Sequence, residues 1–125
     1  MERYRSMAGF QIVLEVSPEV EEVRLPSAAE IQVMRIIQEA LSNVRKHAKA
    51  TQVVVKVSRT GDELRIEVSD NGSGFDPATR LSTGWPRFGL QTMRERAEAV
   101  GGAFSVQSAP GRGTKVMVIL PAGLA

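Results

Sequence analysis

The longest regular signal in the sequence is a run of helix-forming residues, free of glycine and proline, from about residue 28 to residue 48. Ser27 and Glu30 occupy the first and fourth positions of a capping box, in which the serine side chain accepts from the third helical N–H and the glutamate reaches back. The pattern predicts a helix of about five turns over residues 28–48. No other segment constrains the fold as strongly.

Apolar residues recur along this helix at steps of three and four, which is typical of an amphipathic helix. The predicted apolar side comprises Met34, Ile37, Leu41, Val44 and Ala48. Three polar residues fall near the opposite side: Glu39, Asn43 and Lys46. The polar side is therefore expected to face a binding site or solvent.

Alternating or β-branched apolar runs predict strands before and after the helix. Residues 10–16 suit a first strand, and residues 1–9 are expected to be a tail. Residues 53–57 and 64–68 are separated by a turn sequence at 59–62, which indicates an antiparallel hairpin.

The second half of the chain begins with a long irregular segment at residues 70–88, which collects glycine and proline. Connections of that length are usually functional lids or disordered segments. Residues 90–100 regain helical spacing and are followed by a glycine pair, a natural helix stop. Residues 104–106 and 116–120 are expected to pair as strands across a second glycine turn.

Size, cysteine content and charge exclude several classes of protein. A chain of 125 residues fits one domain and can bury a core without disulfides or a structural metal. Cysteine is absent, so thiolate catalysis and cysteine-bound zinc are excluded and any metal must be held by oxygen ligands. The apolar runs are too short to span a bilayer. The net charge is only +2, so basic residues form a local patch at 45–49 rather than a nucleic-acid-binding surface.

Residues with useful chemistry gather in three separated segments. Glu39 and Asn43 lie one helical turn apart, which places a carboxylate and an amide on one helical face. Residues 70–75 follow a predicted strand and combine an acid with flexible backbone, and residues 110–114 supply another glycine turn. Taken singly, the first is also typical of a solvated helix face and the second of a strand-ending turn. Together they indicate a nucleotide site.

Four segments, in this order and spacing, resemble the ATP-binding catalytic domain of bacterial sensor histidine kinases: Gln38 to Ala48, Asp70 to Phe75, Phe88 to Arg96, and Gly111 to Thr114. The Met-Arg-Glu-Arg run within the third segment is most similar to the nitrate-sensor-like subfamily. The resemblance covers residues 10–121, which sets the expected domain and leaves residues 1–9 and 122–125 as tails.

The wider group includes gyrase, a heat-shock chaperone and mismatch-repair ATPases, and the resemblance implies their Bergerat-type ATP-binding fold. This is an α+β fold, a two-layer α/β sandwich whose mixed, mostly antiparallel sheet is covered on one face by helices.

The resemblance also implies ATP and Mg²⁺ as cofactors. Asn43 would ligate the Mg²⁺ that bridges the phosphates, and Glu39 would order the metal's water or act as a base. Asp70 would accept a hydrogen bond from the adenine amino group, which favours ATP over GTP, and Thr114 would reach the same purine edge through a water. The expected nucleotide-binding residues are Asn43, Lys46, His47, Asp70, Gly72, Gly74, Arg87, Gly89, Leu90, Gly113 and Thr114.

By the same resemblance, residues 76–89 would form a mobile lid over the phosphates, followed by a helix N-terminus that faces the anion. Lys46, with His47 or Arg45, would add positive charge there. For this single histidine a role beside the phosphates is favoured, a plain position on the helix surface stays an open alternative, and a phosphoacceptor role is disfavoured. Arg87 replaces the glycine usual in the family, so it would either stiffen the lid or contact phosphate, with weaker or slower nucleotide binding.

The implied function is half of a kinase reaction. The chain would bind ATP with Mg²⁺ and present the γ-phosphate to a histidine on a separate dimerisation domain of the parent kinase, with a response regulator as indirect partner. The isolated domain is expected to be monomeric and cytoplasmic and to be inactive in autophosphorylation. It is expected neither to bind nucleic acid nor to insert into a membrane, whether or not the parent kinase is membrane-anchored. Two alternatives stay open: a stand-alone serine kinase resembling anti-sigma factors, and a non-catalytic module that has lost nucleotide binding.

Overall fold

The computed structural model describes residues 2–7, 10–18, 20, 23–74, 90–121 and 123–124. In this part of the chain, helix α1 (Ser27–Asn43) continues into a π-helical segment, η2 (Val44–Ala48), and helix α2 (Leu90–Ala99) follows later. The described strands are β1 (Glu2–Met7), β2 (Phe10–Val16), β3 (Val23–Arg24), β4 (Gln52–Thr60), β5 (Glu63–Asp70), β6 (Ala103–Ser108), β7 (Thr114–Pro121) and β8 (Gly123–Leu124).

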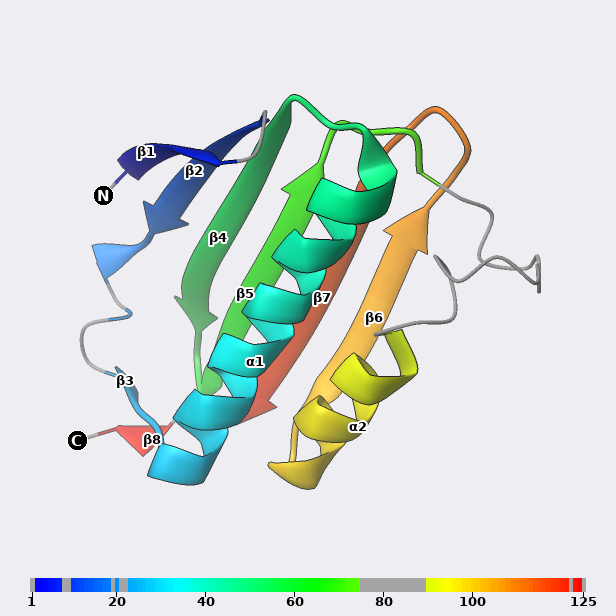
Figure 1. Ribbon diagram of the computed structural model, residues 1–125. Coiled ribbons are helices and arrows are strands. Elements are labelled where there is room, and N and C mark those ends of the chain that lie inside the picture. Colours follow the sequence, from blue (N-terminus) through cyan, green and yellow to red (C-terminus); the bar gives the residue numbers. More distant parts are fainter. Residues whose placement is uncertain are drawn as a thin grey trace.

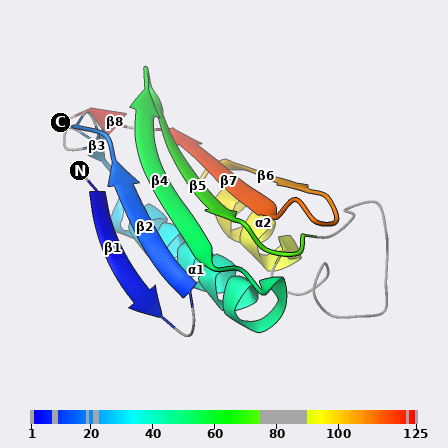
Figure 2. The same ribbon diagram turned by 90° about the horizontal axis from the view of Figure 1, so that it is seen from above.

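The main sheet has six strands in the order β1-β2-β4-β5-β7-β6, and β3 pairs with β8 in a separate two-stranded sheet. Strands β2 and β4 run parallel, while the other neighbours in the main sheet are antiparallel. Both helices lie on the same face of the sheet (Figures 1 and 2). The predicted two-layer α+β architecture with a mixed, mostly antiparallel sheet is therefore confirmed.

The core lies between the helices and alternate residues of the central strands. Every second residue of β4, β5 and β7 points to the helix layer, because side chains alternate between the faces of a strand. The buried apolar residues of these three strands are Val53, Val55, Leu64, Ile66, Val68, Val116, Val118 and Leu120. They form one cluster with the helix residues Ile36, Ala40, Met93 and Ala97.

The two helices also contact each other and the edge strand β6. Arg96 of α2 donates to the side-chain oxygen of Gln32 on α1, with 3.1 Å between the two atoms. The guanidinium of Arg94 lies over the ring of Phe104 in β6, 5.6 Å from its centroid. These contacts fix the position of α2, whose first turn borders the site described below.

Two predictions for the long helix are wrong. The residue that precedes the first helical position is Pro26, and no side chain caps the N-terminus, so Ser27 does not form a capping box with Glu30. Instead, the Pro26 carbonyl accepts from the N–H groups of Ala29 and Glu30 at 2.9 and 3.1 Å. Pro26 takes an extended conformation, which moves the start of the helix one residue earlier and leaves Ser27 inside it.

The buried face of α1 agrees with the predicted apolar side only in part: Ile37 and Leu41 pack against the core and Val44, in η2, is buried, as predicted. The helix buries Ala29, Ile36, Ala40 and Asn43, whereas Met34 is 55% exposed. The pattern was ambiguous because Ile36 and Ile37 are neighbours and support two overlapping stripes. The sheet packs against the stripe that contains Ile36, which brings Asn43 to the buried face instead of the opposite side.

The chain ends differ from the expected tails. Residues 2–7 form β1, which pairs antiparallel with β2 from Glu2 opposite Glu15 to Met7 opposite Phe10. Residues 123–124 form β8 opposite β3. Backbone groups make these pairings, so they require no apolar pattern that a sequence would reveal.

The remaining predicted elements are confirmed. Strands β4 and β5 form the expected hairpin, whose turn contains Gly61 at φ +58°. Strands β6 and β7 pair across the second glycine turn, and α2 ends before Gly101 at φ +80°. The expected lid at residues 76–89 lies outside the described residues. Neither helix in the described part of the chain is long and apolar enough to cross a bilayer.

Candidate nucleotide-binding site

The candidate site is built around Asp70, the last residue of β5. Asp70 pairs in register with Thr114, the first residue of β7, so the two side chains lie side by side. The Oδ1 atom of Asp70 accepts from the N–H of Gly72 at 2.7 Å. Burial raises the pKa of the Asp70 carboxyl, while hydrogen bonds from the backbone N–H groups of Gly72 and Thr114 oppose this rise. The result is a partly buried acid that is oriented by its own turn.

Two glycines let the loops after β5 and before β7 approach each other closely. Gly74 and Gly113 have φ values of +64° and +73°, a region that favours glycine. A Cβ atom at Gly74 would overlap the carbonyl oxygen of Ala109, and one at Gly113 would overlap the carbonyl oxygen of Asp70. The N–H of Gly111 donates to the Ser73 carbonyl at 2.7 Å. Only glycine fits at Gly74 and Gly113, and the two glycine segments form one backbone frame.

Asn43 approaches the same place from the end of α1. Its side chain is buried, and its amide nitrogen has no hydrogen-bond partner among the described residues. A buried amide without a partner is unfavourable and is rare in proteins unless it serves a ligand or a water. Asn43, Asp70 and Thr114 line one narrow cavity, together with Ala40, Val44, Val68, Leu90 and Val116. The three separated segments therefore converge as the sequence indicated.

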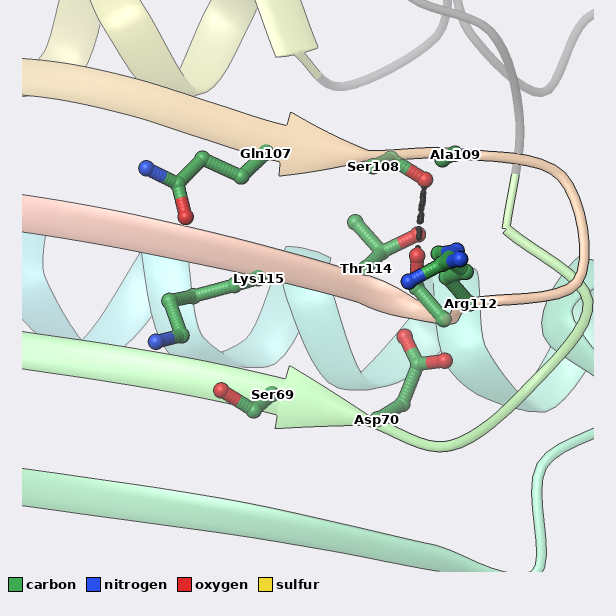
Figure 3. Close-up of a pocket in the computed structure, with 9 residues that line it drawn as sticks. Ser69, Asp70, Gln107, Ser108, Ala109, Arg112, Thr114 and Lys115 are labelled. Carbon is green, nitrogen blue, oxygen red and sulfur yellow. Dashed lines mark hydrogen bonds between the residues drawn. The ribbon is translucent and has the colours of Figure 1, made fainter.

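Asp70 and Thr114 also border a wider, more open hollow with a volume of about 380 Å³. Figure 3 shows their side chains turned toward each other, with the Ser108 hydroxyl bound to Thr114. Two cationic residues, Arg112 and Lys115, line the same hollow. Asp70 thus lines both the narrow cavity and this wider hollow.

Two polar residues of the site were missed by the sequence predictions. Ser108 ends β6, and its hydroxyl donates to the Gly113 carbonyl and contacts the Thr114 hydroxyl, each at 2.9 Å. A signal was present, because Ser108 is a polar residue at a helix-facing strand position directly before a glycine turn.

Asn71 is the other missed residue. Its Oδ1 accepts from the N–H groups of Thr51 and Gln52 at 2.9 and 3.0 Å, and its amide nitrogen donates to the Thr51 hydroxyl at 2.9 Å. Asn71 therefore joins the end of β5 to the start of β4. Its partners lie about twenty residues away in sequence, so nothing local in the sequence reveals them.

The other predicted site residues are placed less centrally. Glu39 is half-buried one turn before Asn43, and Lys46 is exposed in η2. Leu90 begins α2 and lines the cavity with Asn43. The side chain of His47, and the whole of Arg87 and Gly89, lie outside the described residues.

Protein groups that are able to hold a metal are few. In the ranges that the structure describes, no three histidine, cysteine or acidic side chains come together as a metal cluster. Mg²⁺ usually keeps several waters and binds through one or two protein oxygens and the phosphates of a substrate. The Asn43 amide fits that kind of site in two ways. Its oxygen is a suitable metal ligand, and its nitrogen, which has no partner among the described residues, is able to donate to a phosphate oxygen.

The family follows from comparison with known proteins. Residues 28–124 match the family described as histidine kinase-, DNA gyrase B- and HSP90-like ATPases. The chain belongs to this ATPase family. The match includes every segment on which the sequence resemblance rested, and that prediction is confirmed at the level of the family.

Relatives of this ATPase domain include named sensor kinases. The chain is 36% identical over 124 residues to an uncharacterized sensor-like histidine kinase of Chloroflexus aurantiacus, covering 97% of this chain and 21% of that protein. It is 34% identical over 111 residues to the sensor protein VraS of Staphylococcus aureus, covering 89% of this chain and 31% of that protein. The chain thus spans between a fifth and a third of these relatives, and membership of the nitrate-sensor-like subfamily stays a prediction.

Solved structures show the same fold. The histidine kinase domain of a blue-light activated histidine kinase from Erythrobacter litoralis superposes with a TM-score of 0.66 at 22% identity, covering 86% of this chain and 49% of that one. A second structure of that kinase gives 0.71 at 23% identity, covering 90% of this chain and 35% of the other. The α+β fold of the ATPase domain is therefore confirmed independently of the local motifs.

Proposed function

We propose that this chain is the ATP-binding catalytic part of a two-component sensor histidine kinase, which holds ATP with Mg²⁺ and donates the γ-phosphate to a histidine on a separate dimerisation domain of its parent. The observation that carries the proposal is the shared cavity of Asn43 and Asp70. Phosphoryl transfer depends on positioning and charge neutralisation, and this arrangement provides both.

The purine would bind at the Asp70 end of the cavity. The Asp70 carboxylate accepts from an adenine amino group, and Thr114 reaches the same edge of the ring. The backbone frame around Gly74 and Gly113 leaves no room for side chains between the loops. Gly72 lends its N–H to the carboxylate and so orients the acceptor.

The phosphates and the metal would bind at the Asn43 end. When bound, Mg²⁺ supplies charge neutralisation between the phosphate oxygens. Asn43 offers the metal an amide oxygen, while Glu39, one turn earlier, orders a water or accepts a proton. Lys46 places a cation in η2, just after the end of α1, and we assign His47, Arg87, Gly89 and Leu90 to the same phosphate side.

Because this domain binds ATP and does not carry the phosphoaccepting histidine, the proposed reaction requires two partners. A histidine-bearing dimerisation domain supplies the attacking imidazole, and a response regulator receives the phosphoryl group from it. We propose that the domain works as a monomer in the cytoplasm, without nucleic acid or membrane insertion, whether or not the parent kinase is membrane-anchored. The relatives named as sensor kinases support this assignment over the serine kinase and the non-catalytic module.

Titration calorimetry with a nonhydrolysable ATP analogue, with and without Mg²⁺, tests the binding step. Asp70→Asn should lose at least about tenfold in affinity, equivalent to about 1.4 kcal/mol. Asn43→Asp should change the dependence on Mg²⁺. Matched controls are Asp62→Asn in the exposed β4–β5 turn and Gln38→Glu on the exposed side of α1, which should bind as the unmodified chain does.

Mixing the chain with a histidine-bearing domain and labelled ATP tests the transfer step. Acid-labile label on that domain supports the proposal, because phosphohistidine is hydrolysed by acid. Acid-stable label on a serine would indicate the serine kinase, and no nucleotide binding at all would indicate the non-catalytic module. Label on His47 of the isolated chain would contradict the assignment of this residue to the phosphate side.

A further inference from the structure

Ser108 lies behind the proposed purine contact without lining the narrow cavity itself. It is the last residue of β6 and pairs in register with Thr114, the first residue of β7. Its hydroxyl oxygen is 2.9 Å from the Gly113 carbonyl oxygen and 2.9 Å from the Thr114 hydroxyl oxygen. Figure 3 shows the contact between the Ser108 and Thr114 hydroxyl groups.

The number of hydrogens fixes the direction of these contacts. A serine hydroxyl has one hydrogen to donate and two lone pairs to accept with, whereas a carbonyl oxygen only accepts. Ser108 must therefore donate its hydrogen to Gly113. The contact with Thr114 is then a hydrogen bond only if Thr114 donates to Ser108. This leaves the Thr114 oxygen as an acceptor toward any other group.

The neighbouring Asp70 carboxylate is also an acceptor, so two acceptors stand side by side at this end of the cavity. We infer that Ser108 is a positioning residue that holds the Thr114 hydroxyl in its accepting direction and thereby strengthens the preference for a purine with an amino group at position 6. The inference rests on the proposed nucleotide function. A 6-oxo purine in the same pose would present an acceptor to two acceptors, which is repulsive.

The effect is expected where Thr114 contacts the purine directly, because the hydrogen in that contact then comes from the nucleotide and never from Thr114. A bridging water would remove the preference, since it is able to donate one hydrogen to Thr114 and the other to a 6-oxo group. Removing the Ser108 hydroxyl would release the Thr114 hydrogen to turn into the cavity. Thr114 would then be able to donate to a 6-oxo group, so discrimination would fall although every direct purine contact was still present.

The test compares ATP with inosine triphosphate, which differs at position 6 and carries no extra amino group. Dissociation constants are measured by titration calorimetry for the unmodified chain, Ser108→Ala and Ser108→Thr, which restores the hydroxyl. Ser105→Ala, an exposed serine on the same strand, is the matched control. We expect Ser108→Ala to reduce the preference for ATP about tenfold, as for the loss of one oriented hydrogen bond, with the other two variants unchanged.

Circular dichroism melting identifies a variant that does not fold, and Ser108→Cys, with similar volume and a weak hydrogen-bonding group, then takes the place of the alanine variant. Equal losses of affinity for both nucleotides, or an unchanged preference, would overturn the inference, because a purely structural role predicts one of these results. The proposed function fails differently: the unmodified chain would bind neither nucleotide, which would overturn both statements.

Discussion

The two ends of the site are built in different ways. At the Asp70 end, polar groups are already engaged within the protein: the Asp70 carboxylate with Gly72, Thr114 with Ser108, and Asn71 with β4. At the Asn43 end, the amide nitrogen is buried without a partner among the described residues, and Lys46 is exposed. One end is complete before a ligand arrives, and the other requires one.

This difference separates selectivity from charge neutralisation. A preorganised purine pocket loses little conformational freedom on binding and so discriminates by fit. The Asn43 end keeps an unfavourable buried group in the free protein, which a metal-bound phosphate would relieve. Substitutions in the backbone frame of the first end should therefore lower stability and ligand binding together. Substitutions of the buried polar groups that serve the ligand, Asn43 and more weakly Asp70, should lower binding while they stabilise the free protein.

The largest expected effect is at Gly113. In Gly113→Ala, the new Cβ overlaps the backbone of Asp70 and the φ of +73° is strained, so we expect a loss of about 3 kcal/mol in the free energy of unfolding. Gly111→Ala is the matched control, because Gly111 has φ +77° but no atom near its Cβ position, and should lose only about 1 kcal/mol. Urea denaturation measures both. Equal losses would show that the frame around Asp70 yields to a side chain.

The next effect concerns Asn71. Asn71→Ala removes three side-chain hydrogen bonds to Thr51 and Gln52, and we expect a loss of about 2 kcal/mol because two backbone N–H groups lose their acceptor. Asn71→Asp keeps the acceptor and should lose less. Hydrogen exchange at the Thr51 and Gln52 amides should accelerate in the alanine variant. Unchanged exchange would mean that these amides do not depend on Asn71.

Replacement of Asn43 by an apolar residue should have the opposite sign. Asn43→Leu removes a buried amide whose nitrogen has no partner among the described residues and keeps a branched side chain, so we expect the free protein to gain about 1 kcal/mol in stability. Magnesium-dependent ATP binding should be lost. Melting curves and calorimetry measure the two effects, and Asn71→Leu, at an amide with partners, should only destabilise. Lower stability in both Asn43→Leu and Asn43→Ala would show that this amide already has a partner.

A smaller effect is expected where η2 ends. Lys49 is exposed and adopts φ +54°, a left-handed conformation that strains residues with a Cβ. Lys49→Gly should stabilise the fold by about 0.5 to 1 kcal/mol, since glycine is the preferred residue after a helix. Lys46→Gly, within η2, should destabilise by a similar amount. A loss of stability in Lys49→Gly would show that contacts of the lysine side chain stabilise the fold by more than the left-handed backbone conformation destabilises it.

Much of the fold was predictable because its signals are local. The β4–β5 hairpin follows from a two-residue glycine turn between alternating runs, and α2 follows from helical spacing closed by a glycine pair. The buried side of α1 was not predictable from the sequence. The adjacent Ile36 and Ile37 support two overlapping apolar faces of the helix, and packing against the sheet selects one of them. Strand β1 was missed because its pairing with β2 relies on backbone groups.

The site divides in the same way. Asp70, Gly74 and Gly113 were predictable only as part of a set, because each segment alone is typical of a turn while the segments together occur in the order and spacing of the family. The structure brings them together with Asn43 and Thr114. The roles of Ser108 and Asn71 depend on partners that only the folded chain supplies. Ser108 in particular acts through the direction of one hydrogen, which no spacing of residues encodes.

The smallest expected effect is the pH dependence of stability that the Asp70 carboxyl causes. Its pKa is raised by burial, so the folded state binds this proton more tightly than the unfolded state does, and stability falls as pH rises from the ordinary aspartate range through the raised value. Asp70→Asn should therefore stabilise the free protein slightly at pH 7, by less than about 1 kcal/mol because the group is partly exposed, and the gain should vanish below pH 4 or so. Melting curves of both chains from pH 3 to 8, taken as about the accessible range, measure the difference. ATP affinity should fall in the same acidic range, since a protonated Asp70 no longer accepts from adenine. An aspartate that stabilises the free protein at pH 7 would mean that its hydrogen bonds outweigh its burial, and that the Asp70 end is more fully formed than the comparison with Asn43 requires.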